Sequence, residues 1–248
     1  MTTTHTWDPE RYLTYADERG RPFVELLARV GAPEARNVVD LGCGPGTLTR
    51  LLAERWPGAR VVGLDSSPEM VARGTDVPGV ELAVADLRTW EPAEPVDVLV
   101  SNATLQWVPG HLDLLPRLVG HVAPGGWFAF QVPGNFDEPS HTLRRDLAAE
   151  EPYAAFTAGV ATPDAHDAAT YLDALARLGC EVDAWETTYL HVLTGEDPVF
   201  TWISGTAARP TLQALPDDLR PRFEEELKRR LRAAYQPGPA GVVLPFRR

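Results

Sequence analysis

Apolar residues along the chain alternate between short continuous runs and runs with helical spacing, and this alternation predicts the fold. Short runs rich in β-branched residues predict five strands, at residues 37–41, 61–65, 81–85, 96–101 and 127–132. Between the first two strands, Leu48, Leu51 and Leu52 have the spacing of a helix over residues 47–55. Strands that alternate with helices indicate an α/β fold with a parallel sheet and helices on both of its faces.

The segments on either side of this core are predicted to be mostly helical. A short helix is expected around Tyr12, and a second one begins at Pro22 and stops at Gly31. After residue 132, the pattern predicts helices at residues 140–151, 168–178, 198–205 and 216–235, a long strand at 181–192, and a last strand from Val242.

Length and hydrophobicity favour a single domain made of three parts. The chain has 248 residues, and 44% of them are apolar, which is enough for a sizeable core. We expect a helical lid segment over residues 1–36, a cofactor-binding core over 37–132, and a substrate lid with the final strands over 133–248.

Charge and composition limit the partners. A net charge of −12 argues against a nucleic-acid partner, and without an apolar stretch of 18 residues we expect no membrane partner. Two distant cysteines and six histidines without ligand spacing predict no metal, and they favour the reducing cytoplasm. We expect a monomer or a weak homo-oligomer that acts on a small molecule.

A glycine-rich turn follows the first predicted strand. Asp40 lies near the end of that strand, and Gly42 and Gly44 follow it. Glycines let the backbone approach a ligand closely, and the next helix offers free N–H groups at its start. A dinucleotide-binding fingerprint needs glycine where Thr47 stands, so an NAD(P)-dependent oxidoreductase is a remote alternative.

Polar residues also end the next three strands. Asp65 ends the second, Asp86 follows the third, and Asn102 and Ala103 follow the fourth. Ligands of open α/β sheets bind at the carboxyl ends of the strands, where an acid can accept hydrogen bonds from ribose hydroxyls. The alternative for Asp65 and Asp86 is that each caps the following helix.

Three segments carry a resemblance to a known superfamily. The sequences D-L-G-C-G-P-G (40–46), L-D-S-S-P-E-M (64–70) and A-D-L (85–87) resemble the signature of class I S-adenosylmethionine-dependent methyltransferases. The segments W-D-P-E-R-Y-L, N-A-T-L-Q-W-V-P, F-Q-V-P-G-N-F-D-E-P-S-H and G-C-E-V-D-A-W-E-T-T-Y-L-H resemble the trans-aconitate 2-methyltransferase family. This resemblance implies a Rossmann-like, doubly wound, mostly parallel seven-stranded sheet with a helical lid. In the family the P-F-R-R segment runs on through a last strand, whereas this chain ends at Arg248.

The strand-end pattern and the resemblance together predict where S-adenosylmethionine binds. The expected cofactor-binding residues are Asp40, Gly42, Cys43, Gly44, Gly46, Asp65, Ser66, Asp86, Leu87, Asn102 and Ala103. The resemblance implies O-methylation of a carboxylate of a small polycarboxylic acid, with trans-aconitate as the family's substrate. The alternatives are another small-molecule or carrier-bound acceptor, and a module that only senses the cofactor.

A carboxylate is already ionised at neutral pH, so its methylation needs positioning and no general base. Gln106 and Trp107 are the candidates for positioning the reacting groups. A guanidinium on the reacting carboxylate would lower its nucleophilicity, so arginines are expected on the other carboxylates. The candidate arginines are Arg19, Arg21, Arg209 and Arg248, and the candidate neutral groups are Tyr12, Gln131, Asn135, His141 and Tyr189. Arg19 and Arg21 can both face the substrate only if the chain turns before Pro22.

Overall fold

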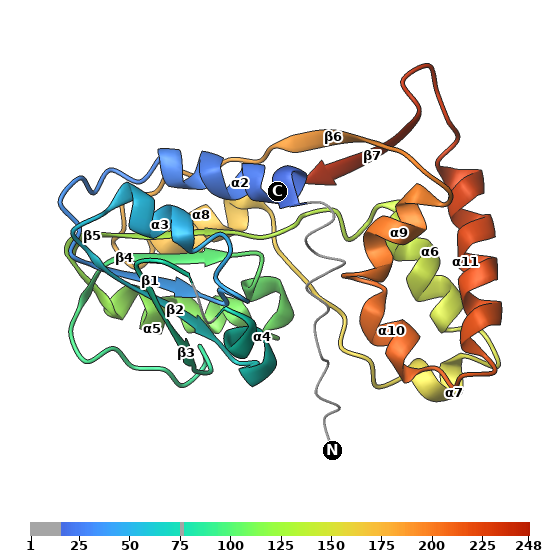
Figure 1. Ribbon diagram of the computed structural model, residues 1–248, viewed down its shortest axis with the longest axis horizontal. Coiled ribbons are helices and arrows are strands. Elements are labelled where there is room, and N and C mark those ends of the chain that lie inside the picture. The colour runs from blue at the N-terminus through green and yellow to red at the C-terminus, as the bar shows by residue number, and fades with distance from the viewer. Residues whose placement is uncertain (1–15, 75–76) are drawn as a thin grey trace. The chain divides into compact units, whose positions relative to one another are not determined.

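The computed structural model describes residues 16–74 and 77–248, and these residues form two compact units. We call residues 16–132 with His166–Trp185 the strand unit, and Pro133–Ala165 with Glu186–Arg248 the helix unit. Figure 1 shows the elements of both units.

A five-stranded parallel sheet forms the centre of the strand unit. Its strands lie in the order β3-β2-β1-β4-β5, with β1 in the middle. Their bounds are β1 Asn37–Leu41, β2 Arg60–Asp65, β3 Val80–Val84, β4 Val96–Asn102 and β5 Val122–Gln131. The chain moves outward from β1 to β3 and then returns to β4, so the strand order reverses beside β1. This reversal is the doubly wound topology that the sequence predicts, and it marks the ligand-binding edge of such sheets.

Helices cover the sheet of the strand unit. The helices are α2 (Ala16–Ala28), α3 (Arg50–Arg55), α4 (Pro68–Arg73), α5 (Leu115–Gly120) and α8 (Ala168–Ala176), with the short 3₁₀ helices η1 (Leu105–Trp107) and η2 (His111–Leu114). Phe23 of α2 and Leu52 of α3 are fully buried against Val38, Val98 and neighbouring strand residues. Figure 1 shows α2 and α3 on one side of the strands and α5 on the other.

The expected helix start at Pro22 is wrong. Helix α2 begins at Ala16 and runs through Pro22, so the chain does not turn between Arg19 and Arg21. A proline at this place forfeits one backbone hydrogen bond. Buried Gly20 approaches Leu48 so closely that an added Cβ would lie 3.4 Å from its Cδ2. Gly20 therefore packs against Leu48 in the turn before the proline, a tertiary contact that the spacing of apolar residues does not reveal.

Five helices and a two-stranded ribbon make up the helix unit. They are α6 (Pro139–Ala148), α7 (Ala154–Thr157), α9 (Pro198–Ser204), α10 (Arg209–Ala214), α11 (Arg220–Ala234), β6 (Thr188–Leu193) and β7 (Val242–Arg247). Phe223, Leu227 and Leu231 form the buried face of α11, which packs on α6 and α9. The ring of Tyr153 meets that of Phe223 edge to face at 5.0 Å. Helix α10 was not predicted, whereas the last strand begins at Val242 as expected.

The expectation of one seven-stranded sheet is wrong for the described residues. Strands β6 and β7 pair with each other, antiparallel, in a separate sheet that runs from Thr188 opposite Arg247 to Leu193 opposite Val242. Residues of β6 are alternately exposed and buried, as expected for a ribbon with one solvent-exposed face. Interior strands of a parallel sheet are instead buried on both faces. The expected strand over 181–192 begins only at Thr188, because the chain passes from the strand unit to the helix unit at residue 186.

Candidate active site

The glycine turn after β1 has a backbone that only glycine adopts easily. Gly42, Gly44 and Gly46 all have positive φ angles, of 78°, 58° and 76°. A Cβ on Gly42 would lie 2.1 Å from Oγ1 of Thr104, so this turn also passes very close to the segment after β4. The turn therefore lies at the carboxyl end of β1, where its glycines carry no side chains that would keep a ligand away from the backbone.

Asp65, at the end of β2, fixes the glycine turn. One carboxylate oxygen accepts from the N–H of Gly44 at 2.8 Å, and the other accepts from the N–H of Ser67 at 2.9 Å. Helix α4 is capped by Ser67, whose hydroxyl accepts from the N–H of Met70, so Asp65 is not the N-cap residue itself. Each oxygen of Asp65 keeps a further lone pair for a ligand hydroxyl. Ser66, beside it, is exposed.

Asp40 is a buried carboxylate in β1, just before the glycine turn. Only 2% of its surface is exposed, and one of its oxygens accepts from the Thr49 hydroxyl at 2.6 Å. Burial, with a further contribution from the negative charge of Asp65, raises the pKa of Asp40 to about 6. The second oxygen, Oδ1, has no hydrogen-bond partner among the described residues. Asp40 is therefore mostly ionised at pH 7, and its free oxygen fits a ligand that carries positive charge or N–H groups.

Cys43 in the same turn is not a nucleophile at neutral pH. Burial raises the pKa of its thiol, and the nearby charges of Asp40 and Asp65 raise it further. The thiol therefore stays protonated, and the expected role of Cys43 is limited to shaping the turn.

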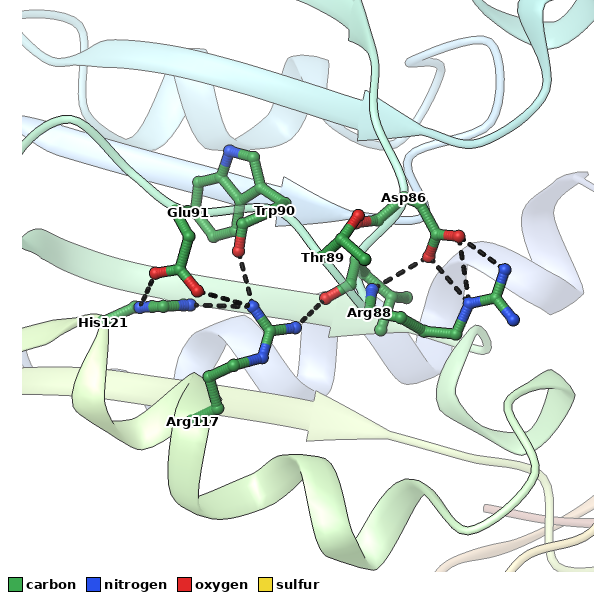
Figure 2. Close-up of polar contacts among 8 residues, drawn as sticks. Asp86, Arg88, Thr89, Trp90, Glu91, Arg117 and His121 are labelled. Atoms are coloured by element: carbon green, nitrogen blue, oxygen red, sulfur yellow. Dashed lines mark hydrogen bonds and ion pairs between the residues drawn. The ribbon is translucent and has the colours of Figure 1, made fainter.

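Asp86 follows β3, and its carboxylate is engaged by Arg88. The Arg88 backbone N–H donates to it at 2.9 Å, and the guanidinium adds contacts at 3.0 and 2.5 Å (Figure 2). The hydrogen bonds from the Arg88 side chain hold the pKa of Asp86 below its usual range. A ligand that uses the Asp86 side chain must share it with Arg88.

Arg117 organises the segment after β3, and the sequence did not point to it. From α5, its guanidinium donates to the backbone carbonyls of Leu87 and Trp90, the second at 2.6 Å. The same group lies 3.3 Å from both Glu91 Oε1 and His121 Nε2, as Figure 2 shows. An arginine that binds carbonyls from another element leaves no signal in local spacing, so sequence patterns could not identify this contact.

The end of β4 is tied to the end of β5. The Gln131 side chain donates to Asn102 Oδ1, and the Ala103 N–H donates to the Gln131 carbonyl at 2.9 Å. Ala103 has a positive φ of 53°, a conformation that costs a non-glycine residue about 1–3 kcal/mol. Gln106 donates to the Ala103 carbonyl at 2.6 Å, and its side-chain oxygen is buried without a described partner. Trp107, in the same 3₁₀ helix, is half-buried.

Comparison with known proteins identifies the family. A family model described as a methyltransferase domain matches residues 12–184. The trans-aconitate 2-methyltransferase of Streptomyces avermitilis is 52% identical, with 98% of this chain and 94% of the relative aligned. The enzyme of that name from Mycobacterium tuberculosis is 51% identical, over 98% of this chain and 94% of its own. The chain belongs to the trans-aconitate 2-methyltransferase family. A solved S-adenosylmethionine-dependent methyltransferase from Thiobacillus denitrificans shares the fold, with 18% identity, a TM-score of 0.53, and coverage of 99% of this chain and 93% of its own.

Family membership settles the class of activity. The chain is a methyltransferase that depends on S-adenosylmethionine, so the alternatives of an NAD(P)-dependent oxidoreductase and of a sensing module are wrong. The described part of the chain contains no helix long and apolar enough to cross a membrane. Within residues 16–74 and 77–248, no group of three or more His, Cys, Asp or Glu side chains could hold a metal ion.

The N-terminal substrate candidates of this family member are only partly described. Tyr12 lies outside the described residues, as does the side chain of Arg19, whose backbone belongs to α2. Arg21 is on the surface, where it forms an ion pair with Glu25 at 2.7 Å one helical turn away. Because α2 continues through Pro22, Arg19 and Arg21 lie on different faces of one helix.

The remaining substrate candidates lie in the helix unit, apart from Gln131 of β5. Asn135 and His141 are brought together, with Asn135 Nδ2 3.2 Å from His141 Nε2, and both are buried. Tyr189 is buried in β6, with its ring stacked on that of His191 at 6.2 Å. Arg209 begins α10, and the guanidinium of Arg248 lies 4.4 Å over the Phe246 ring.

Sequence reasoning missed one buried arginine in α6. Arg144 lies one helical turn after His141 and shares its buried face. The signal was present in the spacing of His141, Arg144 and Leu147, three residues apart each time, which places a basic side chain on the face of α6 that packs inward.

Proposed function

We propose that this enzyme methylates a carboxylate of trans-aconitate, giving a monomethyl ester and S-adenosylhomocysteine. The observation that carries the proposal is a sequence identity of about one half, over 98% of the chain, to relatives named trans-aconitate 2-methyltransferase. The aligned part of each relative therefore extends well beyond the cofactor motifs, over nearly the whole chain.

For this reaction the protein mainly has to position the carboxylate and the methyl donor. Bound S-adenosylmethionine supplies a methyl group on a sulfonium, and as a carboxylate oxygen bonds to its carbon, the carbon–sulfur bond breaks and sulfur keeps the electron pair. The reacting carboxylate is already ionised at pH 7, so no side chain has to remove a proton. Holding the groups in line can contribute about 7–11 kcal/mol to lowering the barrier.

Residues of the strand unit have the properties that binding the cofactor requires. The glycine turn offers bare backbone, and Asp65 has lone pairs for the ribose hydroxyls. The free oxygen of Asp40 suits the positive end of the cofactor, because a buried carboxylate gains from an opposite charge nearby. Leu87 lies on a segment that Arg117 holds in place, where backbone groups can meet the adenine edge.

The acceptor must find positive charge locally, because the chain as a whole carries a net charge of −12. Of its 23 basic residues all but Lys228 are arginines, whose planar fork matches carboxylates in a bidentate manner. We expect arginine on the carboxylates that do not react, and a neutral donor such as that of Gln106 near the one that does.

A direct assay tests the proposal. The protein is incubated with methyl-labelled S-adenosylmethionine and a panel of di- and tricarboxylates, a carrier-bound carboxylate and a small phenol, and methylated products are identified by mass spectrometry. We expect a monomethyl ester of trans-aconitate as the main product. Label transferred to a carrier-bound carboxylate, or to a small molecule without carboxylates, with none on trans-aconitate, would refute the proposal.

The remaining expectations about partners are also part of the proposal. The acidic net charge supports an enzyme without a nucleic-acid partner, acting as a monomer or a weak homo-oligomer. The two free cysteines, far apart in the sequence, support a cytoplasmic location. Sedimentation analysis and fractionation of cells test these two points.

A further inference from the structure

Arg144 of α6 is a buried cation that pairs with no carboxylate in the described part of the chain. Its side chain is 3% exposed, and its described hydrogen bond goes to the hydroxyl of Thr211 in α10, at 2.8 Å. Among the described residues, no carboxylate forms an ion pair with it, and its Nε is buried without a partner. A guanidinium has five N–H donors, so the described residues leave most of the donors of Arg144 without a protein partner.

An unpaired buried charge is costly and therefore informative. Burial lowers the pKa of Arg144 to about 10, with a smaller contribution from neighbouring Arg145. The group thus remains protonated at pH 7. Removing a charge from water without an opposite charge destabilises the fold, so a buried group of this kind is a candidate for binding a ligand of opposite charge.

Polar groups beside Arg144 are also unmatched. His141 Nδ1, Asn135 Oδ1 and Ser140 Oγ are all buried without a described partner. Burial, followed by the positive charge of Arg144, lowers the pKa of His141 to about 4, so its ring is neutral at pH 7. Whichever way the Asn135 amide is oriented, the hydrogen bond between it and His141 leaves one donor and one acceptor of this pair free.

The buried polar groups without a described partner indicate what kind of ligand could bind beside them. The Arg144 guanidinium suits a carboxylate of a small molecule. The free donor and free acceptor of the Asn135–His141 pair suit a further polar group on the same molecule. We propose that Arg144 binds a carboxylate of the acceptor other than the one that is methylated, with His141 and Asn135 beside it. This inference rests on the proposed function for the identity of the acceptor.

The non-reacting carboxylate is the better partner for Arg144. A bidentate guanidinium holds a carboxylate firmly, but it also withdraws the electron density that attack on a methyl group needs. On a carboxylate that does not react, the same contact adds affinity and orientation and leaves the nucleophile untouched. Arg144 would then select acceptors with more than one carboxylate.

The adjacent arginine provides a matched control. Arg145 is exposed, and its described hydrogen bond goes to the Phe136 carbonyl at 3.4 Å. The variants Arg144→Met and Arg145→Met each remove one positive charge from the same turn of α6. Calorimetry with S-adenosylhomocysteine present measures the binding of trans-aconitate without turnover.

We expect Arg144→Met to weaken trans-aconitate binding roughly 10- to 150-fold, the range for hydrogen bonds to a charged group. Arg145→Met should bind it like the wild type, and both variants should bind S-adenosylhomocysteine normally. Ligand-free Arg144→Met should also melt no lower than the wild type, because methionine replaces an unpaired buried charge. Wild-type affinity of Arg144→Met for trans-aconitate would overturn the inference.

Two further arms keep the result decisive. If Arg144→Met does not fold, Arg144→Lys keeps the charge but loses the fork, and a wild-type affinity of that variant for trans-aconitate would overturn the inference. If the wild type neither binds nor methylates trans-aconitate, the proposed function has failed. The same two variants are then compared on the acceptor that the wild type does methylate, where a raised KM with Arg144→Met alone supports Arg144 and an unchanged KM rejects it.

Discussion

Asp40 offers a sharp test of the proposed cofactor site, because its burial should lower the stability of the fold while it favours binding. Its carboxylate is buried and has one unmatched oxygen, and burial raises its pKa from 3.8 to about 6. The native state therefore holds a proton on Asp40 more tightly than the unfolded chain does. The stability that this proton contributes is fully present below pH 3.8 and is lost as the pH rises through about 6.

The perturbation is Asp40→Asn, which keeps the size of the side chain and removes its titration. The difference between about 6 and 3.8, at about 1.36 kcal/mol per pH unit, gives about 3 kcal/mol. Part of this difference falls below pH 4, so the free energy of unfolding of the variant should rise by about 2 kcal/mol relative to the wild type between pH 4 and pH 7. An asparagine also keeps an oxygen that can accept from the Thr49 hydroxyl.

Urea denaturation at a series of pH values measures this difference. Asp218→Asn, which removes one exposed charge, is the control for the change in net charge. The same variant Asp40→Asn should bind S-adenosylhomocysteine at least tenfold more weakly, because the buried negative charge is gone. A stability difference that does not change between pH 4 and pH 7 would refute the reasoning.

Three other predictions concern the cofactor site. Asp65→Ala should lower the affinity for S-adenosylhomocysteine by roughly 10- to 150-fold in calorimetry, and unchanged binding would remove Asp65 from the site. Gly42→Ala should lower the melting temperature far more than Gly125→Ala, because both glycines have φ near 78° but only Gly42 would press its Cβ against Thr104, at 2.1 Å. Equal losses would show that backbone strain alone matters. Activity should survive exhaustive chelation, and a loss restored by a divalent ion would contradict this.

The sequence by itself determined the fold of the strand unit and the glycine turn at its sheet edge. The alternation of strands and helices, with a glycine turn after β1 and acids near the ends of the next two strands, is local information. The carboxyl ends of parallel strands meet at one edge of a sheet. This local information is therefore enough to predict that Gly44 and Asp65 lie close together, and they are within hydrogen-bonding distance. The same local reasoning found the helix boundaries of α8 and α9 to within a few residues.

Only the tertiary structure decided which strands pair and which polar groups are buried. The ribbon of β6 and β7 depends on partners about 50 residues apart, and a run of alternating residues does not say whether it joins a large sheet or a small one. The hydrogen bond from Arg117 to the segment after β3 likewise comes from another element, α5. The spacing of His141, Arg144 and Leu147 indicates that Arg144 faces inward, but it does not reveal that no described carboxylate pairs with Arg144, because that depends on its neighbours in space.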